Sequence, residues 1–193
     1  DLNTSYTKTT KVTNPKTKKV TTTRTTVKTG ISAIKDLGVS HVQLLPIYDF
    51  MSGGNEADPR FNWGYDPLNY NAPEGQYSTD PANPWSRVRE LKQAVNVMHQ
   101  QGLRTIMDVV YNHVSSPDDF SMNLLVPGYF FRVNPTTGDY YNATGCGNEV
   151  ASERPMVRKF IVDSAVHWAR DYNLDGFRFD LMGILDVTTM QQV

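Results

Sequence analysis

The strongest constraint on this chain is a helix, a short link and an apolar strand, which occur in that order three times. The predicted helices carry apolar residues at helical spacing and cover residues 31–37, 84–101 and 155–172. The predicted strands are apolar runs, as expected when both faces are covered, at residues 41–46, 104–110 and 176–180. This order is typical of parallel α/β structure, so we expect three adjacent strands in one sheet, in sequence order.

The length of the chain limits how the sheet can close. A doubly wound sheet and a closed barrel both fit the pattern, but a (β/α)8 barrel takes about 250 residues and this chain has 193. If the fold is a barrel, we expect a partial (β/α)8 TIM barrel, with about three parallel strands. Residues 47–83 and 114–150 are expected to be long loops after strands, the position in which α/β enzymes hold their sites.

Residues 1–29 differ in composition from residues 30–193, which we assign to the incomplete barrel. The first segment is rich in threonine and lysine, and Asp1 is its only acid. Two β-branched stretches, 6–12 and 20–27, flank a turn at Pro15, which favours a hairpin. A flexible linker and a basic tail that binds an acidic partner are the alternatives.

Bulk composition excludes several classes of protein. No apolar run approaches the roughly 20 residues of a membrane helix, and a net charge of -1 gives no argument for nucleic acid or an anionic membrane. Neither is expected as a partner. Cys146 is the only cysteine, which excludes a disulfide framework and a CxxC zinc site.

Three clusters of polar and aromatic residues lie at or just beyond the carboxyl ends of the predicted strands. They are Phe61–Pro67, Asp108–His113 and Gly176–Gly183. The carboxyl ends of parallel strands lie at the same edge of a sheet, so all three clusters should converge on one rim.

Arg178 and Asp180 form the clearest chemical pair in these clusters. Residues two apart on a strand face the same way, so both side chains should point together, with Phe177 and Phe179 toward the helices. An arginine beside a carboxylate keeps the carboxylate ionised and oriented, which suits a nucleophile. The alternative is a capping aspartate with a structural ion pair.

The other polar and aromatic residues each allow a structural and a functional interpretation. His113 would bind a sugar hydroxyl, act as a base or bind metal, or it is structural. Asp108 lies deeper in its strand and is expected to tie down neighbouring backbone. Trp63 and Tyr65 would stack on sugar rings through their apolar faces, or they pack within the loop.

Together the clusters resemble the α-amylase superfamily of glycoside hydrolases, family 13, and most closely its type I pullulanases. The resemblance runs from about Gly30 to Gln192. Asp108–His113 matches the first signature region of the superfamily, and Gly176–Gly183 matches the second. Phe61–Pro67 resembles the YNWGYDP motif of type I pullulanases, with phenylalanine in place of the first tyrosine.

The resemblance implies a role for each matching residue. Asp180 would be the nucleophile that attacks the anomeric carbon, and Arg178 would keep it ionised. His113 would bind hydroxyls of the sugar at the cleavage point, Tyr65 would stack under that sugar, and Asp66 would help shape the subsite. The asparagine that matches Asn112 binds calcium in many amylases. Pullulanases often lack that site, so calcium is left open and not claimed here, and no other cofactor is expected.

The implied function is starch debranching by a retaining mechanism, with cleavage of α-1,6-glucosidic links in pullulan, amylopectin and glycogen. A secreted or cell-surface bacterial enzyme is expected. Retaining hydrolysis needs a second carboxyl group as acid and base, which the resemblance places on the next barrel strand, after Val193. We therefore expect the 193 residues alone to be inactive.

Three alternatives remain open. The first is another enzyme of the superfamily, such as an isoamylase, a glycogen-debranching enzyme or an α-amylase. The second is a non-catalytic carbohydrate-binding module. The third is a doubly wound phosphate-binding enzyme, for which Gly53-Gly54 is a weak match to the required glycine-rich turn.

Overall fold

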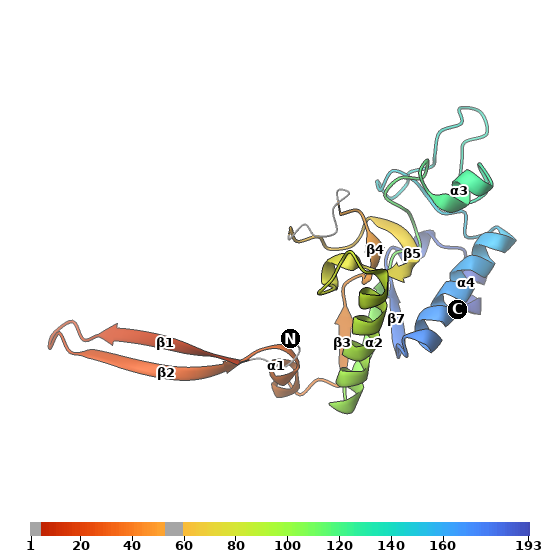
Figure 1. The fold of residues 1–193 in the computed structure, drawn as a ribbon. Helices are drawn as coiled ribbons and strands as arrows, with labels where there is room; N and C mark the ends of the chain where they lie inside the picture. Colours follow the sequence, from red (N-terminus) through yellow and green to blue (C-terminus); the bar gives the residue numbers. More distant parts are fainter. Residues whose placement is uncertain (1–4, 53–59) are drawn as a thin grey trace.

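The computed structural model describes residues 5–52 and 60–193 (Figure 1). Gly53 and Gly54, considered above as a phosphate-binding turn, lie outside the described residues. A long two-stranded hairpin projects from the body, which consists of a three-stranded sheet, its helices and the loops above it (Figure 1). None of the helices in these two described ranges is long and apolar enough to cross a membrane.

The central sheet has the order β3-β6-β7 and is parallel throughout. Its strands are β3 (His41–Leu44), β6 (Arg104–Val109) and β7 (Gly176–Phe179). The helices that precede them are α1 (Gly30–Asp36), α2 (Pro84–Gln100) and α4 (Pro155–Asp171). The prediction of three adjacent parallel strands in sequence order is confirmed, and each helix ends within one or two residues of its predicted limit.

Local sequence signals explain where α2 begins and ends. The Asn83 side chain accepts a hydrogen bond from Trp85 N at 3.1 Å, and Pro84 occupies the first helical position, where its missing N–H is not needed. Gly102 follows the helix with φ +77°, a conformation that glycine adopts without strain. The chain then enters β6 within two residues, so the link from helix to strand is short.

The N-terminal segment forms the hairpin of β1 (Ser5–Thr13) and β2 (Val20–Lys28), one of the three alternatives stated for it. Its turn is organised by Asn14, whose side chain accepts hydrogen bonds from Lys16 N at 2.9 Å and Thr17 N at 3.1 Å. Every residue of both strands is exposed except Val27, which is partly buried.

Buried aromatic residues hold the carboxyl end of β6 against α4. Trp168 is fully buried and donates a hydrogen bond to the main-chain oxygen of Tyr70 at 2.9 Å. The Tyr70 hydroxyl donates to the main-chain oxygen of His113 at 2.6 Å. Tyr111 and Ser164 share a hydrogen bond of 2.7 Å between their hydroxyls. The backbone that carries His113 is therefore fixed from beneath by packed and hydrogen-bonded rings.

Residues 47–83 and 114–150, which were expected to be long loops, also contain short strands and helices. In the first, β4 (Tyr48–Phe50) pairs antiparallel with β5 (Pro67–Pro73), and a short 3-10 helix, η1 (Gly75–Tyr77), follows. The register of this pair shifts twice, so its side chains do not alternate regularly and the sequence shows no period. The second segment holds the short helix α3 (Ser121–Leu125), and beyond β7 lie η2 (Met182–Ile184) and α5 (Val187–Gln192).

A buried carboxylate fixes the small β4–β5 sheet to the segment that follows it. Glu74 is 2% exposed, and its two oxygens accept hydrogen bonds from Phe50 N at 3.0 Å and Gln76 N at 2.7 Å. The main-chain oxygen of Asp66 accepts a hydrogen bond from Met51 N at 3.0 Å. Both ends of the loop that contains Phe61–Pro67 are thereby tied to one sheet.

Candidate active site

The site begins where β6 and β7 end. The parallel register pairs Asp108 with Arg178 and Val109 with Phe179. Asp180 N then donates a hydrogen bond to Val109 O at 2.9 Å. Asp180 is thus the first residue beyond β7, and its backbone is still held by the neighbouring strand.

One guanidinium nitrogen connects two carboxylates. Arg178 Nη1 lies 2.9 Å from Asp108 Oδ1, 3.0 Å from Asp108 Oδ2 and 2.8 Å from Asp180 Oδ1. The Asp108 side chain is 1% exposed, that of Asp180 is 17% exposed, and that of Arg178 is 44% exposed. The hydrogen bond that Arg178 donates to Asp108, and the negative charge of Asp108, raise the pKa of Arg178 above its ordinary value. Arg178 and Asp180 therefore point together, as strand alternation predicted.

Asp108 was expected to tie down neighbouring backbone, and this expectation is wrong. Its oxygens accept hydrogen bonds from side chains, those of Arg178 and of Tyr65, whose hydroxyl donates to Asp108 Oδ2 at 2.7 Å. The reason is register: Asp108 lies opposite Arg178 on a neighbouring parallel strand, so both side chains lie on one face. Burial, and then the hydrogen bond to Asp108, raise the pKa of Tyr65 to about 12.

Asn112 connects the two strand ends through its side chain. Its amide nitrogen donates a 2.9 Å hydrogen bond to the main-chain oxygen of Asp180 and lies 3.5 Å from Asp180 Oδ2. Its amide oxygen is bonded to His113 Nδ1. Asn112 is 1% exposed, so both ends of its amide are used within the protein. No role at the nucleophile was predicted for it, and its position beside His113 was the signal available.

His113 lies in the interior of the same cluster. It is 6% exposed, and burial lowers its pKa below the ordinary value. A hydrogen bond to the backbone of Tyr65 and the negative charges of Asp180 and Asp66 act in the opposite direction. The imidazole therefore lies close to the loop after β4 and to both strand ends.

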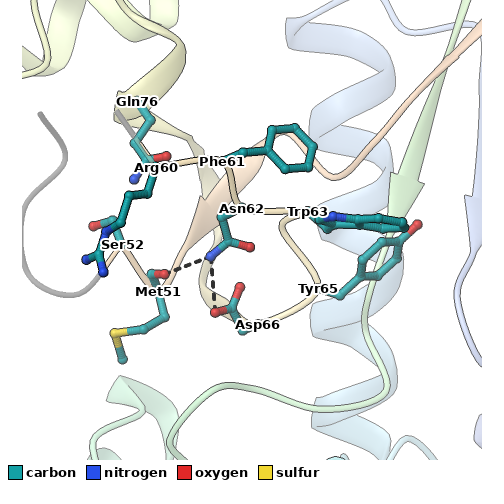
Figure 2. Close-up of a pocket in the computed structure, with 9 residues that line it drawn as sticks. All are labelled: Met51, Ser52, Arg60, Phe61, Asn62, Trp63, Tyr65, Asp66 and Gln76. Atoms are coloured by element: carbon teal, nitrogen blue, oxygen red, sulfur yellow. Dashed lines mark hydrogen bonds between the residues drawn. The ribbon is translucent and has the colours of Figure 1, made fainter. Parts of the chain in front are cut away.

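The loop Phe61–Pro67 is organised by Asn62 (Figure 2). Its side-chain nitrogen donates to Met51 O at 2.9 Å and to Asp66 Oδ2 at 3.3 Å, and its oxygen accepts from Gly64 N at 2.8 Å. Asp66 Oδ1 is buried and has no hydrogen-bond partner among the described residues, and burial raises the pKa of this carboxyl. Asn62 was also missed as a positioning residue, although an asparagine two residues before a glycine is a turn signal.

Trp63 lies at the outer edge of the site. It is 64% exposed, and its ring centroid lies 6.4 Å from that of Phe61, which is 74% exposed. The loop borders a cavity of about 500 Å³ (Figure 2). Its lining residues are Met51, Ser52, Arg60, Phe61, Asn62, Trp63, Tyr65, Asp66 and Gln76. The cavity shares Tyr65 and Asp66 with the candidate residues described above, and Asp180 is not among its lining residues.

The structure brings five of the six candidate residues into one connected cluster: Tyr65, Asp66, His113, Arg178 and Asp180. Trp63 adjoins the cluster through the loop that it shares with Tyr65. Within residues 5–52 and 60–193, no group of three or more histidine, cysteine, aspartate or glutamate side chains could hold a metal ion. The arrangement provides an oriented carboxylate, a neighbouring imidazole and an aromatic wall, which together suit a polar ring-shaped substrate.

This chain matches one family model and is similar in sequence to a pullulanase and to an isoamylase. Residues 25–125 match the family model described as "Alpha amylase, catalytic domain". The pullulanase of Bacillus subtilis is 52% identical over 163 residues, which is 83% of this chain and 22% of that protein. Isoamylase 3 from the chloroplast of Oryza sativa is 35% identical over 167 residues, which is 80% of this chain and 21% of that protein.

A solved structure extends the match to three dimensions. The pullulanase of Paenibacillus barengoltzii, crystallised with maltohexaose and α-cyclodextrin, superposes with a TM-score of 0.81 at 54% identity. The match covers 84% of this chain and 26% of that one. The chain thus has the α/β fold of part of a (β/α)8 barrel, and it spans about a quarter or less of the length of these relatives.

Proposed function

Because this chain belongs to the family of α-amylase catalytic domains, we propose that it carries the nucleophile side of the active site of a starch-debranching glycoside hydrolase. The substrates are α-glucans with α-1,6-glucosidic links: pullulan, amylopectin and glycogen. The observation that carries the proposal is the Arg178 guanidinium, which holds Asp180 Oδ1 at 2.8 Å at the carboxyl end of β7.

Asp180 acts as the nucleophile in this proposal. Its Oδ1 is bonded to Arg178, and among the described residues its Oδ2 is bonded only to the Asn112 amide, at 3.5 Å. Oδ2 is therefore the oxygen available to attack. It forms a bond to the anomeric carbon while the glycosidic C–O bond breaks, and the leaving oxygen takes a proton from an acid. Water then releases the sugar from Asp180 with retention.

The proton donor has to be a carboxyl group other than Asp108. Both oxygens of Asp108 are already bound, by Tyr65 and by Arg178, and the side chain is 1% exposed. Retaining glycosidases place the acid about 5 Å from the nucleophile and in contact with the leaving oxygen. The buried position of Asp108 suits the different task of orienting Arg178 and Tyr65.

The remaining residues form the sugar-binding wall. Tyr65 presents a half-buried ring whose hydroxyl is fixed, and Trp63 adds an exposed ring farther out. The His113 side chain lies close to Tyr65, Asp66 and Asp180, and it donates to a sugar hydroxyl by exchanging its hydrogen bond to the Tyr65 backbone. Asp66 lines the cavity next to Trp63 and Tyr65. The Paenibacillus barengoltzii pullulanase was crystallised with maltohexaose, which supports an α-glucan as the ligand here. The proposed chemistry uses no cofactor.

A second candidate is an isoamylase-type enzyme of the same superfamily, which the rice relative at 35% identity favours. The run Asn62–Pro67, which matches the motif of type I pullulanases, argues for pullulan as the preferred substrate. Comparing turnover of pullulan with turnover of glycogen separates the two, because the motif predicts the faster rate on pullulan.

The test uses a chimera in which residues 30–193 replace the matching segment of Bacillus subtilis pullulanase. In this chimera Asp180→Asn should lower the release of reducing ends from pullulan by at least several powers of ten, because an amide cannot act as an anionic nucleophile. Binding of maltohexaose should be largely kept, since the shape is nearly unchanged. The 193-residue chain alone should release none.

Asp175→Asn is the matched control for that experiment. Asp175 precedes β7 at the opposite end of the sheet and binds Arg104 and His99. Its variant should keep the turnover of the parent chimera. Near-normal turnover by Asp180→Asn, or an equal loss in both variants, would remove Asp180 from the mechanism.

A further inference from the structure

The hairpin of β1 and β2 lies outside the site and has no part in the proposed hydrolysis. The family match begins at residue 25, so most of the hairpin lies before it. The hairpin projects away from the body (Figure 1). Residues 5–28 contain seven cations and no aspartate or glutamate, and the cations are Lys8, Lys11, Lys16, Lys18, Lys19, Arg24 and Lys28.

The strand register assigns these cations to faces. Lys11 pairs with Thr22, and Arg24 pairs with Thr9. Paired residues share a face and residues two apart on a strand do too, so these four lie on one face. Lys8 lies on the other face, opposite Thr25. The turn between the two strands carries three more lysines, Lys16, Lys18 and Lys19.

Apart from Lys28, these cations form no ion pair with the described residues of the hairpin or of the body. Lys28 is bound to Asp36 at 2.8 Å, and it is the only one of the seven that forms an ion pair with another described residue. Lys11, Lys19 and Arg24 are exposed. The face formed by Lys11, Arg24, Thr9 and Thr22, together with the turn lysines, is called the cationic ribbon below.

We propose that the cationic ribbon binds a linear phosphodiester polymer that carries no nucleobases, of the poly(glycerol phosphate) type. Positions two apart on a strand repeat every ~7 Å, so the cations and hydroxyls of the ribbon form an extended row. Lysine acts as a compact point charge toward phosphate, and threonine hydroxyls donate to phosphate oxygens. A flexible phosphodiester chain can place successive charges along such a row.

The residues of the ribbon argue against nucleic acid as the partner. Bidentate contacts to base edges come from arginine, lysine, asparagine and glutamine, and the two strands contain one arginine, Arg24, and no asparagine or glutamine that would read adenine. Binding of single strands relies on aromatic side chains that stack on bases. Tyr6 is the only aromatic residue of the hairpin, and it lies on the opposite face, with Lys8. The ribbon therefore has charge and hydroxyls for phosphate but no aromatic ring that would stack on a base.

The experiment measures binding of the whole 193-residue chain to immobilised poly(glycerol phosphate) over a series of salt concentrations. The test variant carries Lys11→Gln, Lys19→Gln and Arg24→Gln. The control carries Lys35→Gln, Arg89→Gln and Arg170→Gln, three cations of the helical body with the same change of charge. A third variant, Lys11→Arg with Lys19→Arg, keeps the charge of the ribbon. Thermal melts show that each variant folds as the parent does.

The ribbon variant should bind at least tenfold more weakly than the parent, and the body variant and the arginine variant should bind as the parent does. Each phosphate contact contributes about -0.7 to the slope of log affinity against log salt, so losing three contacts should reduce the slope by about 2. Absence of binding by the parent, or an equal loss in the ribbon and body variants, would overturn the proposal. Tighter binding of duplex DNA at equal phosphate concentration would overturn it in favour of a nucleic acid.

Discussion

Asn112 donates a 2.9 Å hydrogen bond to the main-chain oxygen of Asp180, and the two residues are 68 positions apart in the sequence. The bond joins the chain just beyond β6 to the chain just beyond β7. Because Asn112 is 1% exposed and its amide oxygen is bonded to His113, its orientation is fixed. The proposed nucleophile is thus positioned from two sides, by Asn112 on its backbone and by Arg178 on its carboxylate.

Asn112→Asp should slow pullulan hydrolysis by the chimera at least tenfold, mainly in kcat. The substitution keeps the shape but replaces a donor by an anionic oxygen that faces the carbonyl and the carboxylate of Asp180. A tenfold loss corresponds to about 1.4 kcal/mol of activation free energy. The repulsion between two anionic oxygens in a partly buried site is large enough to account for it. The measurement is steady-state kinetics on pullulan with kcat and KM resolved separately.

The control for this prediction is Asn148→Asp. Asn148 is also 1% exposed, and its side chain binds the backbone N–H and carbonyl of Val114. Its variant should lose stability while the surviving folded enzyme keeps its kcat. Parental kcat in Asn112→Asp would show that the bond to Asp180 has no positioning role.

Asp108→Asn should both destabilise the 193-residue chain and impair the chimera. Removing one partner of a fully buried ion pair costs about 3–5 kcal/mol. Arg178 is 44% exposed, so water screens part of the loss. We expect the free energy of unfolding to fall by about 2 kcal/mol, measured by urea denaturation. Turnover should fall as well, because Arg178 and Tyr65 lose their shared anionic partner.

Asp175→Asn separates the two effects of Asp108→Asn. Like Asp108, Asp175 binds an arginine, Arg104, but it lies at the other end of the sheet. It also accepts a hydrogen bond from the backbone amide of Thr105. The Asp175→Asn variant should lose stability but keep the kcat of the parent chimera. If Asp108→Asn likewise left kcat unchanged, Asp108 would be a structural residue alone.

The helices and the sheet could be predicted from the sequence because each is governed by local rules. The apolar stripe of Pro84–Gln100, its Asn83 cap and Gly102 together set one helix and its ends. The two-residue alternation of a strand likewise predicts that Arg178 lies beside Asp180, and the 2.8 Å contact between them agrees. Signals of this kind need only a few neighbouring residues.

The partners of Asp108 could not be predicted from local rules. They come from Tyr65 and Arg178, which are 43 and 70 residues away along the chain. The strand β4 escaped prediction for a different reason. It is three residues long and has two register shifts, so no periodicity distinguishes it from a loop.

Acid sensitivity of the folded chain should depend on His113. Burial lowers its folded pKa below the unfolded value of about 6.5, so the unfolded state binds more protons as pH falls. The stability that neutral His113 contributes is therefore present above pH 6.5 and is lost as pH falls from about 6.5 toward the lower folded pKa. Asp66 and Asp180 face the ring and reduce this effect.

His113→Gln should make the free energy of unfolding less dependent on pH between about 7.5 and 5.5, the range around the unfolded pKa. The measurement is urea denaturation of the parent and the variant at several pH values in that window, comparing slopes rather than absolute stabilities. His41→Gln replaces an exposed histidine at the start of β3 and serves as the control. An unchanged slope in His113→Gln would contradict the prediction.

Gly64→Ala should distort the loop that carries Trp63 and Tyr65. Gly64 has φ +83°, and a Cβ atom built there would lie 2.9 Å from Pro46 O and 3.1 Å from a ring carbon of Phe50. The left-handed conformation costs alanine roughly 1–2 kcal/mol, and overpacking adds roughly 1–3 kcal/mol. We expect a total loss of about 3 kcal/mol in the free energy of unfolding.

Gly138→Ala isolates the steric part of that loss. Gly138 has nearly the same conformation, φ +81°, but a Cβ atom there would meet nothing within 4 Å. Its alanine variant should therefore lose only about 1–2 kcal/mol, from backbone strain alone. In the chimera, Gly64→Ala should also raise KM for pullulan, since Gly64 lies between the two aromatic residues of the sugar-binding wall, and Gly138→Ala should not. Equal destabilisation of the two variants would mean that Pro46 and Phe50 yield to the added methyl group, and the tight packing of this loop would then have no part in positioning Tyr65.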